Sequence, residues 1–339
     1  MTKTSLSLAA LTLLAATAAT TTAQAQSSVT LFGVVDVNAR SIKNDTRQTR
    51  IDSSGLSSSR LGFRGVEDLG DGLKAGFWLE AALNPDDGNA SGLAFQRRST
   101  VSLMGNFGEV RLGRDKVPSQ LNWDDFDPFG NTGMGAVTRL SVAPGIVPTG
   151  GAFNTFSRAN NLFSYFTPNL GGFYGQLSVS PDEGTLGNEH RGFRAGYRAG
   201  PLHVSLGYGQ TEVTSSIDAK ETNFGASYDL KFMNLIGFYS TLDVGPAAQD
   251  NWLIGVTVPM DKILLRASWS EMDGKEALTG RDARMVALGA SYNLSRRTAL
   301  YTTYSRIRND GTRFTVGTGS PLAVGRASTG YDVGIRHSF

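Results

Sequence analysis

The chain has 339 residues, of which 41 are glycine and none is cysteine, and a formal net charge of +2. A chain this close to neutrality has no general attraction for nucleic acid, so nucleic acid is not expected as a partner. The mean hydropathy is −0.17, and no stretch after residue 25 approaches the long apolar run that a membrane-spanning helix needs.

Residues 1–25 predict a cleaved secretory signal peptide. Lys3 is their only charge, a run of Ala and Leu follows it, and Ala23-Gln24-Ala25 fits a cleavage site of small residues. We therefore expect the mature chain to begin at Gln26 and residues 26–339 to form one β domain. An exported domain without disulfides is typical of periplasmic or outer-membrane proteins whose backbone is already fully paired.

The mature chain alternates between apolar and polar or small residues almost from end to end. In residues 329–339, Tyr331, Val333 and Ile335 share one face, and Asp332 and Arg336 lie on the other. Such period-two alternation predicts β-strands with one apolar face. Sixteen strands are expected, at 28–40, 56–66, 73–83, 97–104, 109–115, 161–167, 173–180, 190–198, 202–210, 222–230, 232–242, 251–258, 263–271, 283–293, 298–307 and 329–339.

The links between these strands alternate between short and long. Short links are rich in Gly, Pro, Asn and Asp, as hairpin turns are. The long links are 41–55, 84–96, 116–160, 181–189, 211–221, 243–250, 272–282 and 308–328. A soluble sandwich also alternates, but this rhythm of links and the polar second face favour a transmembrane β-barrel with a polar lumen. An even strand number places both termini on the short-turn, periplasmic side.

The third long link, residues 116–160, is the outlier. It lacks periodicity, carries Asp124, Asp125 and Asp127 close together, and intersperses them with apolar residues such as Trp123 and Phe126. A long link of this kind is either functional or disordered. Its composition leaves two interpretations open, a loop folded into the lumen and an extracellular flap.

Several arginines belong to the face that turns into the lumen. Arg60 precedes Leu61 and Phe63, which face outward, and Arg64 and Arg111 fall on the inward set by the same argument. A guanidinium stays charged at physiological pH, and several held together attract anions. These arginines could equally form ion pairs with loop acids that stiffen the wall, and the two roles are compatible.

Six segments also resemble the general porins of β-proteobacteria, and the match runs the length of the mature chain. They are SSVTLFGVVDVNAR (27–40), SSSRLGFRGVEDLGDGLKAGFWLE (57–80), RRSTVSLMGNFGEVRLGRD (97–115), RANNLFSYFTPNLGGF (158–173), LSRRTALYTTYS (294–305) and GYDVGIRHSF (330–339). The resemblance implies an all-β fold, a 16-stranded antiparallel transmembrane β-barrel in the outer membrane of a Gram-negative bacterium. It also implies a homotrimer, with the long third loop folded into the pore.

The same resemblance implies roles for individual residues. In anion-selective members, wall arginines face the inward loop, and the matching positions are Arg60, Arg97 and Arg158. Asp127 and Glu80 are the expected acids of the constriction, and the loop departs from the family pattern around 119–157. The terminal Phe339 is the expected signal for the barrel assembly machinery. The barrel would stand among outer-membrane lipids, and small ions and hydrophilic solutes would pass through its lumen.

Enzyme classes find little support. The three histidines are His190, His203 and His337, and none lies in a nucleophile-elbow, His-Glu-x-x-His or Walker-type spacing. We expect no catalytic residue, no metal and no cofactor. The alternatives to a general channel are a substrate-specific channel of the same fold, a plugged structural or adhesin barrel, and an outer-membrane enzyme.

Overall fold

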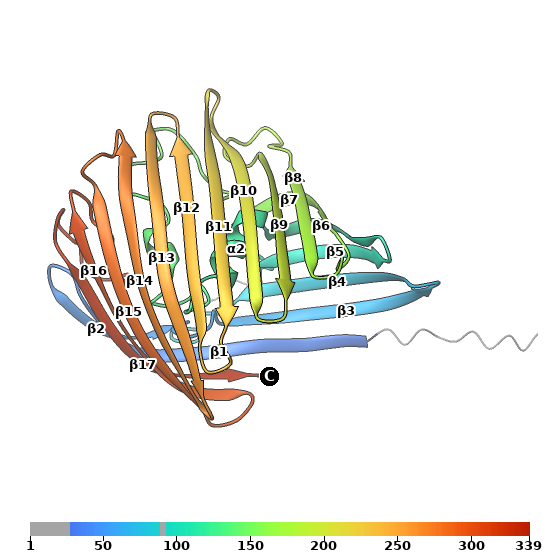
Figure 1. Ribbon diagram of the computed structural model, residues 1–339, viewed down its shortest axis with the longest axis horizontal. Helices are drawn as coiled ribbons and strands as arrows, with labels where there is room; N and C mark the ends of the chain where they lie inside the picture. Colours follow the sequence, from blue (N-terminus) through green and yellow to red (C-terminus); the bar gives the residue numbers. More distant parts are fainter. Residues whose placement is uncertain (1–27, 89–92) are drawn as a thin grey trace, which may run out of the picture.

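A computed structural model describes residues 28–88 and 93–339; the predicted signal peptide, residues 1–25, lies outside the described residues. The described chain forms one antiparallel sheet that closes into a barrel, because the first strand pairs with the last (Figure 1). Its strands are β1 (Ser28–Lys43), β2 (Arg47–Ser53), β3 (Arg60–Gly70), β4 (Leu73–Ala82), β5 (Arg98–Gly105), β6 (Gly108–Lys116), β7 (Arg158–Phe166), β8 (Phe173–Ser180), β9 (His190–Ala199), β10 (Leu202–Thr214), β11 (Ile217–Asp229), β12 (Asn234–Val244), β13 (Ala247–Met260), β14 (Ile263–Glu276), β15 (Asp282–Asn293), β16 (Thr298–Asp310) and β17 (Ser328–Ser338).

Sixteen of these strands form the barrel wall, and β2 is an addition to it. The first part of β1 pairs with β3, and its last part, Val37 to Lys43, pairs with β2. Because β1 extends beyond the end of β3, its remaining backbone groups need a partner, and the chain folds back as β2 to supply one. The prediction of sixteen barrel strands is thus confirmed, while the link predicted at 41–55 contains a strand.

Several strands run further than their alternation predicted. β13 and β14 extend to Ala247 and Glu276, and the link predicted at 243–250 is only a tight turn at Gly245 and Pro246. Charged residues such as Asp250 and Asp273 interrupt the apolar alternation there, but the backbone hydrogen bonds continue past them. The ladder therefore persists beyond the apolar belt that the sequence pattern detects.

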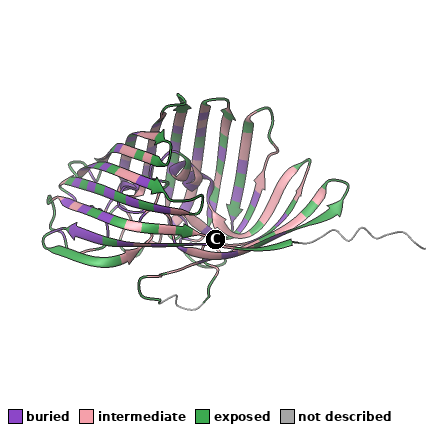
Figure 2. Ribbon diagram, turned by 90° about the horizontal axis from the view of Figure 1, so that it is seen from below, coloured by how far each residue is buried: buried purple, intermediate pink, exposed green. Residues whose placement is uncertain are grey.

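The two faces of the wall differ as alternation predicted (Figure 2). Leu206, Leu288 and Ile335 are more than 40% exposed on the outside, whereas His203 and Ser205 are buried on the inside. An apolar outside and a polar inside are the arrangement of a barrel that stands in lipid. Among the described residues, no helix has the length and apolar character needed to cross a membrane.

The two ends of the described chain meet at the closure of the barrel. Gly33 and Phe339 exchange two backbone hydrogen bonds of 3.1 Å, and the ring of Phe339 covers Gly33 on the outer face. A Cβ at position 33 would lie 2.3 Å from the ring atom Cζ. A side chain at position 33 would therefore displace the Phe339 ring from its place over the closure.

The third long link packs against the inner face of the wall. It contains α2 (Pro118–Asp125), which begins with a proline at a favourable position, and the 3₁₀ turn η1 (Val137–Leu140). Figure 1 shows α2 behind β10 and β11, and Asn122 Nδ2 donates to Asn223 Oδ1 of β11 at 2.8 Å. Trp123 donates to Glu221, and the loop buries two apolar clusters against the wall. These contacts explain the interspersed apolar residues of the link.

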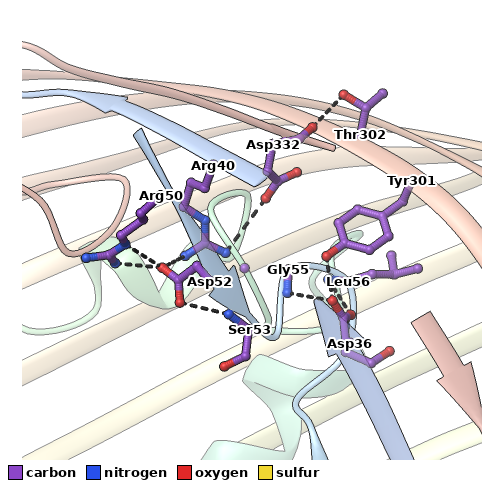
Figure 3. A network of polar contacts seen from close by, with 12 residues as sticks. Asp36, Arg40, Arg50, Asp52, Ser53, Gly55, Leu56, Tyr301, Thr302 and Asp332 are labelled. Carbon is purple, nitrogen blue, oxygen red and sulfur yellow. Dashed lines mark hydrogen bonds and ion pairs between the residues drawn. The ribbon is translucent and has the colours of Figure 1, made fainter. Parts of the chain in front are cut away.

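A buried polar network anchors β1 to its surroundings (Figure 3). The fully buried carboxylate of Asp36 accepts the N–H groups of Gly55, Leu56 and Ser57 at 2.7–3.1 Å and the hydroxyl of Tyr301 at 2.5 Å. Four donors thus share one carboxylate. The network holds the segment before β3 and the wall strand β16 to the same residue of β1.

Candidate functional site: an arginine cluster inside the barrel

Three arginines meet because of the strands that carry them. Arg60 and Arg158 are the first residues of β3 and β7, and Arg97 directly precedes β5. In an antiparallel sheet these alternate strands run in the same direction, so their first residues lie at the same edge. Arg158 Nε donates to the carbonyl oxygen of Arg97 at 2.8 Å, and Arg97 Nε lies 2.6 Å from Glu80 Oε1. The structure thus brings together the residues that the sequence analysis selected.

Two adjoining cavities share this cluster. One has a volume of about 490 Å³ and the other about 320 Å³. Both are lined by Arg60, Arg97, Lys116 and Arg158, so these four side chains stand where the two cavities meet. Glu80 lines the larger cavity, and Asp124 of the third loop lines the smaller one. A solute passing between the two cavities therefore passes the four cationic side chains.

The lining has an excess of positive charge. Among the described residues, the two cavities have six cationic and three acidic lining side chains: Arg60, Arg97, Arg98, Arg111, Lys116 and Arg158 against Glu80, Asp115 and Asp124. Glu80 pairs with Arg97, and Asp124 pairs with Lys116. Arg60 and Arg158 form no ion pair with any described residue, so their charges remain available to a passing ion.

Arg64 and Arg111, the other two arginines selected from the sequence, do not join the cluster of Arg60, Arg97 and Arg158. The Arg64 guanidinium lies over the rings of Trp78 and Phe32, at 5.1 and 5.5 Å from their centroids. Arg111 is bonded to Glu109 at 2.9 Å and to Asp115 at 2.7 Å. Its charge is thus compensated within the wall.

The three loop acids lie in three different surroundings. Asp124 reaches Lys116 and the cluster, whereas Asp125 points to the other wall, pairing with Arg194 and with Arg198 at 3.2 Å. Successive residues of a helix are turned by about 100° about its axis, which separates these two neighbours. Asp127 is 5% exposed and lines neither cavity. Of the two acids expected at the constriction, Glu80 lies beside the arginines and Asp127 does not. The loop acid beside the arginines is Asp124.

Asp127 holds the loop itself in shape. Its carboxylate accepts the backbone N–H groups of Phe129, Asn131 and Val137 at 2.9–3.1 Å. Burial raises the pKa of Asp127 to about 6, against the opposing effect of these three donors. Through these three bonds the carboxylate ties the residues after α2 to the start of η1.

The variant Asp127→Ala is expected to loosen the third loop. Each buried N–H group left without an acceptor costs about 1–3 kcal/mol, so local opening becomes at least about tenfold more frequent. Hydrogen exchange of the amides of Phe129, Asn131 and Val137 measures this opening. Thr132→Ala, which removes one local hydroxyl contact to Gly130, is the matched control. Equal exchange rates in the two variants would show that Asp127 does not organise the loop.

Two cationic residues of the site lay outside the sequence prediction. Lys116 follows a bulge between Gly113 and Asp115, and a bulge shifts the alternation, so the facing of Lys116 is not readable from a period of two. Arg98 lies directly after Arg97, and strict alternation puts adjacent residues on opposite faces. Arg97 and Arg98 nevertheless both line the larger cavity. Arg97 lies before the first residue of β5, so the alternation of the strand does not fix the direction of its side chain. A run of two arginines at a strand start was the available signal.

A closed antiparallel barrel with an apolar outside, a polar inside and a charged internal cluster defines a channel of the outer membrane. The family model described as Gram-negative porin matches residues 10–312, and the chain belongs to this family. It is 41% identical to outer membrane porin protein 32 of Delftia acidovorans, over 98% of this chain and 99% of that protein. It is 29% identical to an outer membrane porin protein of Bordetella pertussis, over 94% and 96% of the two chains.

The fold has a close counterpart among solved structures. The anion-selective porin from Comamonas acidovorans superposes with a TM-score of 0.84 at 38% identity, covering 93% of this chain and all of that chain. The family and the fold together point to a channel and away from an enzyme. The protein is therefore an outer-membrane porin.

Proposed function

We propose that this porin prefers anions, and that Arg60, Arg97 and Arg158, together with Lys116, set the preference. The observation that carries the proposal is the excess of cationic side chains where the two cavities meet. Arginine stays ionised in a water-filled lumen, and cations on low-dielectric walls raise the local concentration of anions. The likeness to the anion-selective porin from Comamonas acidovorans supports the same proposal.

The third loop is proposed to narrow the lumen at this cluster. Asp124 of α2 and Thr138 of η1 line the smaller cavity opposite Arg60 and Arg158. The anchors of the loop lie on the far wall, where Asn122 bonds Asn223 and Asp125 pairs with Arg194. A loop held on one side and facing the arginines on the other confines ions to the space beside those arginines.

The assembled state is proposed from the resemblance to general porins of β-proteobacteria. The mature chain would begin at Gln26, be inserted among outer-membrane lipids by the barrel assembly machinery and form a homotrimer. Phe339 would serve as the assembly signal. Its paired position opposite Gly33 is compatible with a residue that is read before the barrel closes.

Purified and refolded protein is expected to insert into planar bilayers as open channels whose conductance appears in groups of three equal steps. Three steps follow from three independent lumens in one trimer, and single-channel recording measures them. A change of electrophoretic mobility on heating shows that the trimers are folded. Folded trimers that conduct no ions would contradict the proposal of an open pore and favour a plugged barrel.

A general diffusion channel and a substrate-specific one differ in saturation. The large polar lining predicts that current rises in proportion to solute concentration, without blockage by any single small anion. Saturation of the current together with blockage by one solute would instead identify a substrate-specific channel of the same fold.

A further inference from the structure

The outer face of β15 and β16 carries a group of arginines at the long-loop edge of the barrel. Arg306 and Arg308 follow Tyr304 on the exposed face of β16, and Arg284 occupies the exposed face of β15. Arg284 is the direct cross-strand partner of Arg308, and Val286 is the partner of Arg306. We call Arg284, Arg306 and Arg308 the arginine patch. Neighbouring positions of this kind lie about 5–8 Å apart, close enough for one anionic group to contact more than one guanidinium.

The patch has four acidic neighbours on the same outer face, of which only Glu271 forms an ion pair with one of its arginines: Glu271, Asp273, Asp282 and Asp310. Arg284 Nε pairs with Glu271 Oε1 at 2.7 Å, while its side chain remains 67% exposed. Within the described part of the chain, Arg306 and Arg308 form no ion pair or side-chain hydrogen bond. Asp310, on the same face beyond Arg308, forms no ion pair with a described residue either. Two guanidinium groups thus point outward with their donors free.

The patch lies at the level of the membrane interface. Trp269 is the cross-strand partner of Val286, and Tyr304 is the partner of Tyr331; all three aromatic side chains are 39–51% exposed on the outer face. Aromatic side chains on the outside of such barrels mark the boundary between the hydrocarbon and the headgroups. Arg306 is therefore level with this boundary, and Arg308 lies just beyond it. Headgroups of the outer leaflet stand at this height.

An apolar groove of about 520 Å³ begins directly below the patch. It spans β13 to β16 on the outer face and is lined by Val256, Val258, Leu265, Leu288, Ala290 and Tyr304. The small side chains of Ala267 and Ala290 leave space between the larger ones. Arg306 lies two positions after Tyr304, a span of about 7 Å along the strand. A chain of methylene groups seated in the groove would thus end beside the arginines.

We propose that this face binds an anionic glycolipid of the outer leaflet, with its phosphate groups on Arg284, Arg306 and Arg308 and an acyl chain in the groove. Arginine matches phosphate oxygens with paired donors, and its charge attracts anionic headgroups at a membrane surface. The groove supplies apolar contact for the acyl chain at the depth where acyl chains lie. Charge, height and shape together select a phosphorylated, acylated lipid.

The test is a titration of the folded full-length protein in dodecyl maltoside with hexa-acylated, bisphosphorylated lipid A, with bound lipids counted by native mass spectrometry. Arg306→Ser/Arg308→Ser is expected to weaken binding by roughly tenfold or more. Lipid A without its phosphates is expected to bind the wild type as weakly as the phosphorylated lipid binds this variant. Ala290→Phe, which fills the groove and keeps the charges, is expected to weaken binding of the phosphorylated lipid severalfold.

The matched control removes two positive charges from another part of the wall. Arg191 and Lys220 face outward at the same edge on β9 and β11, but the strand β10 separates them, and Arg191 already bonds Gln210 Oε1 at 3.2 Å. Arg191→Ser/Lys220→Ser is expected to bind lipid A like the wild type. Unchanged channel conductance shows that each variant is folded.

Three results would overturn the proposal. The first is equal lipid A binding by the wild type and Arg306→Ser/Arg308→Ser. The second is a loss of lipid A binding in the control variant as large as in Arg306→Ser/Arg308→Ser. The third is that Arg306→Ser/Arg308→Ser still binds lipid A while its protomers no longer associate. The last result would assign the patch to protein contact.

Discussion

Replacing Arg60, Arg97 and Arg158 together by serine is expected to abolish anion preference while leaving the channel open. The lining of the two cavities changes from six cationic and three acidic side chains to three of each. A unit charge about 8 Å away in water changes the energy of an ion by about 0.5 kcal/mol before screening. Three charges therefore change it by about 1.5 kcal/mol, roughly a tenfold change in anion concentration at the cluster.

The measurement for this variant is the ratio of anion to cation permeability in planar bilayers, with Arg64→Ser as the matched control. Arg64 also faces the lumen but lines neither cavity, and it lies four residues from Arg60, about 13 Å along β3. Salt at 0.1 M screens charges beyond about 10 Å, so the control is expected to shift the ratio only slightly. Equal shifts in the triple variant and the control would mean that the lumen acts as a whole and the cluster has no special role.

Asp36→Ala is expected to destabilise the barrel by at least about 3 kcal/mol. The substitution leaves one buried and two part-buried backbone N–H groups and the buried Tyr301 hydroxyl without their charged acceptor, and a buried donor of this kind costs about 1–3 kcal/mol. Asp36→Asn keeps one acceptor oxygen and should lose less. Urea unfolding of the refolded protein in lipid vesicles, followed by tryptophan fluorescence, gives the free energy of unfolding.

Substitutions at Tyr301 and Tyr304 distinguish the loss of the hydrogen bond to Asp36 from a general effect of removing a tyrosine hydroxyl. Tyr301→Phe removes one donor to Asp36 and should cost about 1–3 kcal/mol, while Tyr304→Phe alters an outward-facing ring and should cost little. The double variant Asp36→Ala/Tyr301→Phe should lose less than the sum of the single losses, because both share one contact. Additive losses would show that the two residues act independently and that the network does not bind β16 to β1.

The barrel was predictable because its wall obeys one rule. In β17, Tyr331 and Val333 face outward and Asp332 inward, as alternation requires, and the same rule holds on strand after strand. Strand ends were less predictable. Asp250 and Asp273 lie beyond the apolar belt, but the backbone hydrogen bonds between β13 and β14 continue past them. The sequence pattern reports only the polarity of side chains, so it does not reveal where the backbone pairing ends.

The arginine cluster was predictable only in part. The inward position of Arg60 follows from Leu61 and Phe63, but Arg97 and Arg158 were identified through resemblance, and their meeting depends on three strands starting at one edge. Lys116 was hidden by a bulge. Asp127 was misplaced beside the arginines because a loop without periodicity does not reveal that its carboxylate turns back to its own backbone. Loop conformation depends on such contacts between distant residues, which no local pattern encodes.

The reversal potential of the wild-type channel in a KCl gradient tests the central claim most directly. Chloride and potassium diffuse at nearly equal rates in water, so any potential reports the charge that the lumen presents to ions. The unpaired Arg60 and Arg158 predict a potential whose sign corresponds to chloride permeating faster than potassium. A potential near zero, or one of the opposite sign, would contradict the assignment of anion preference to the arginine cluster.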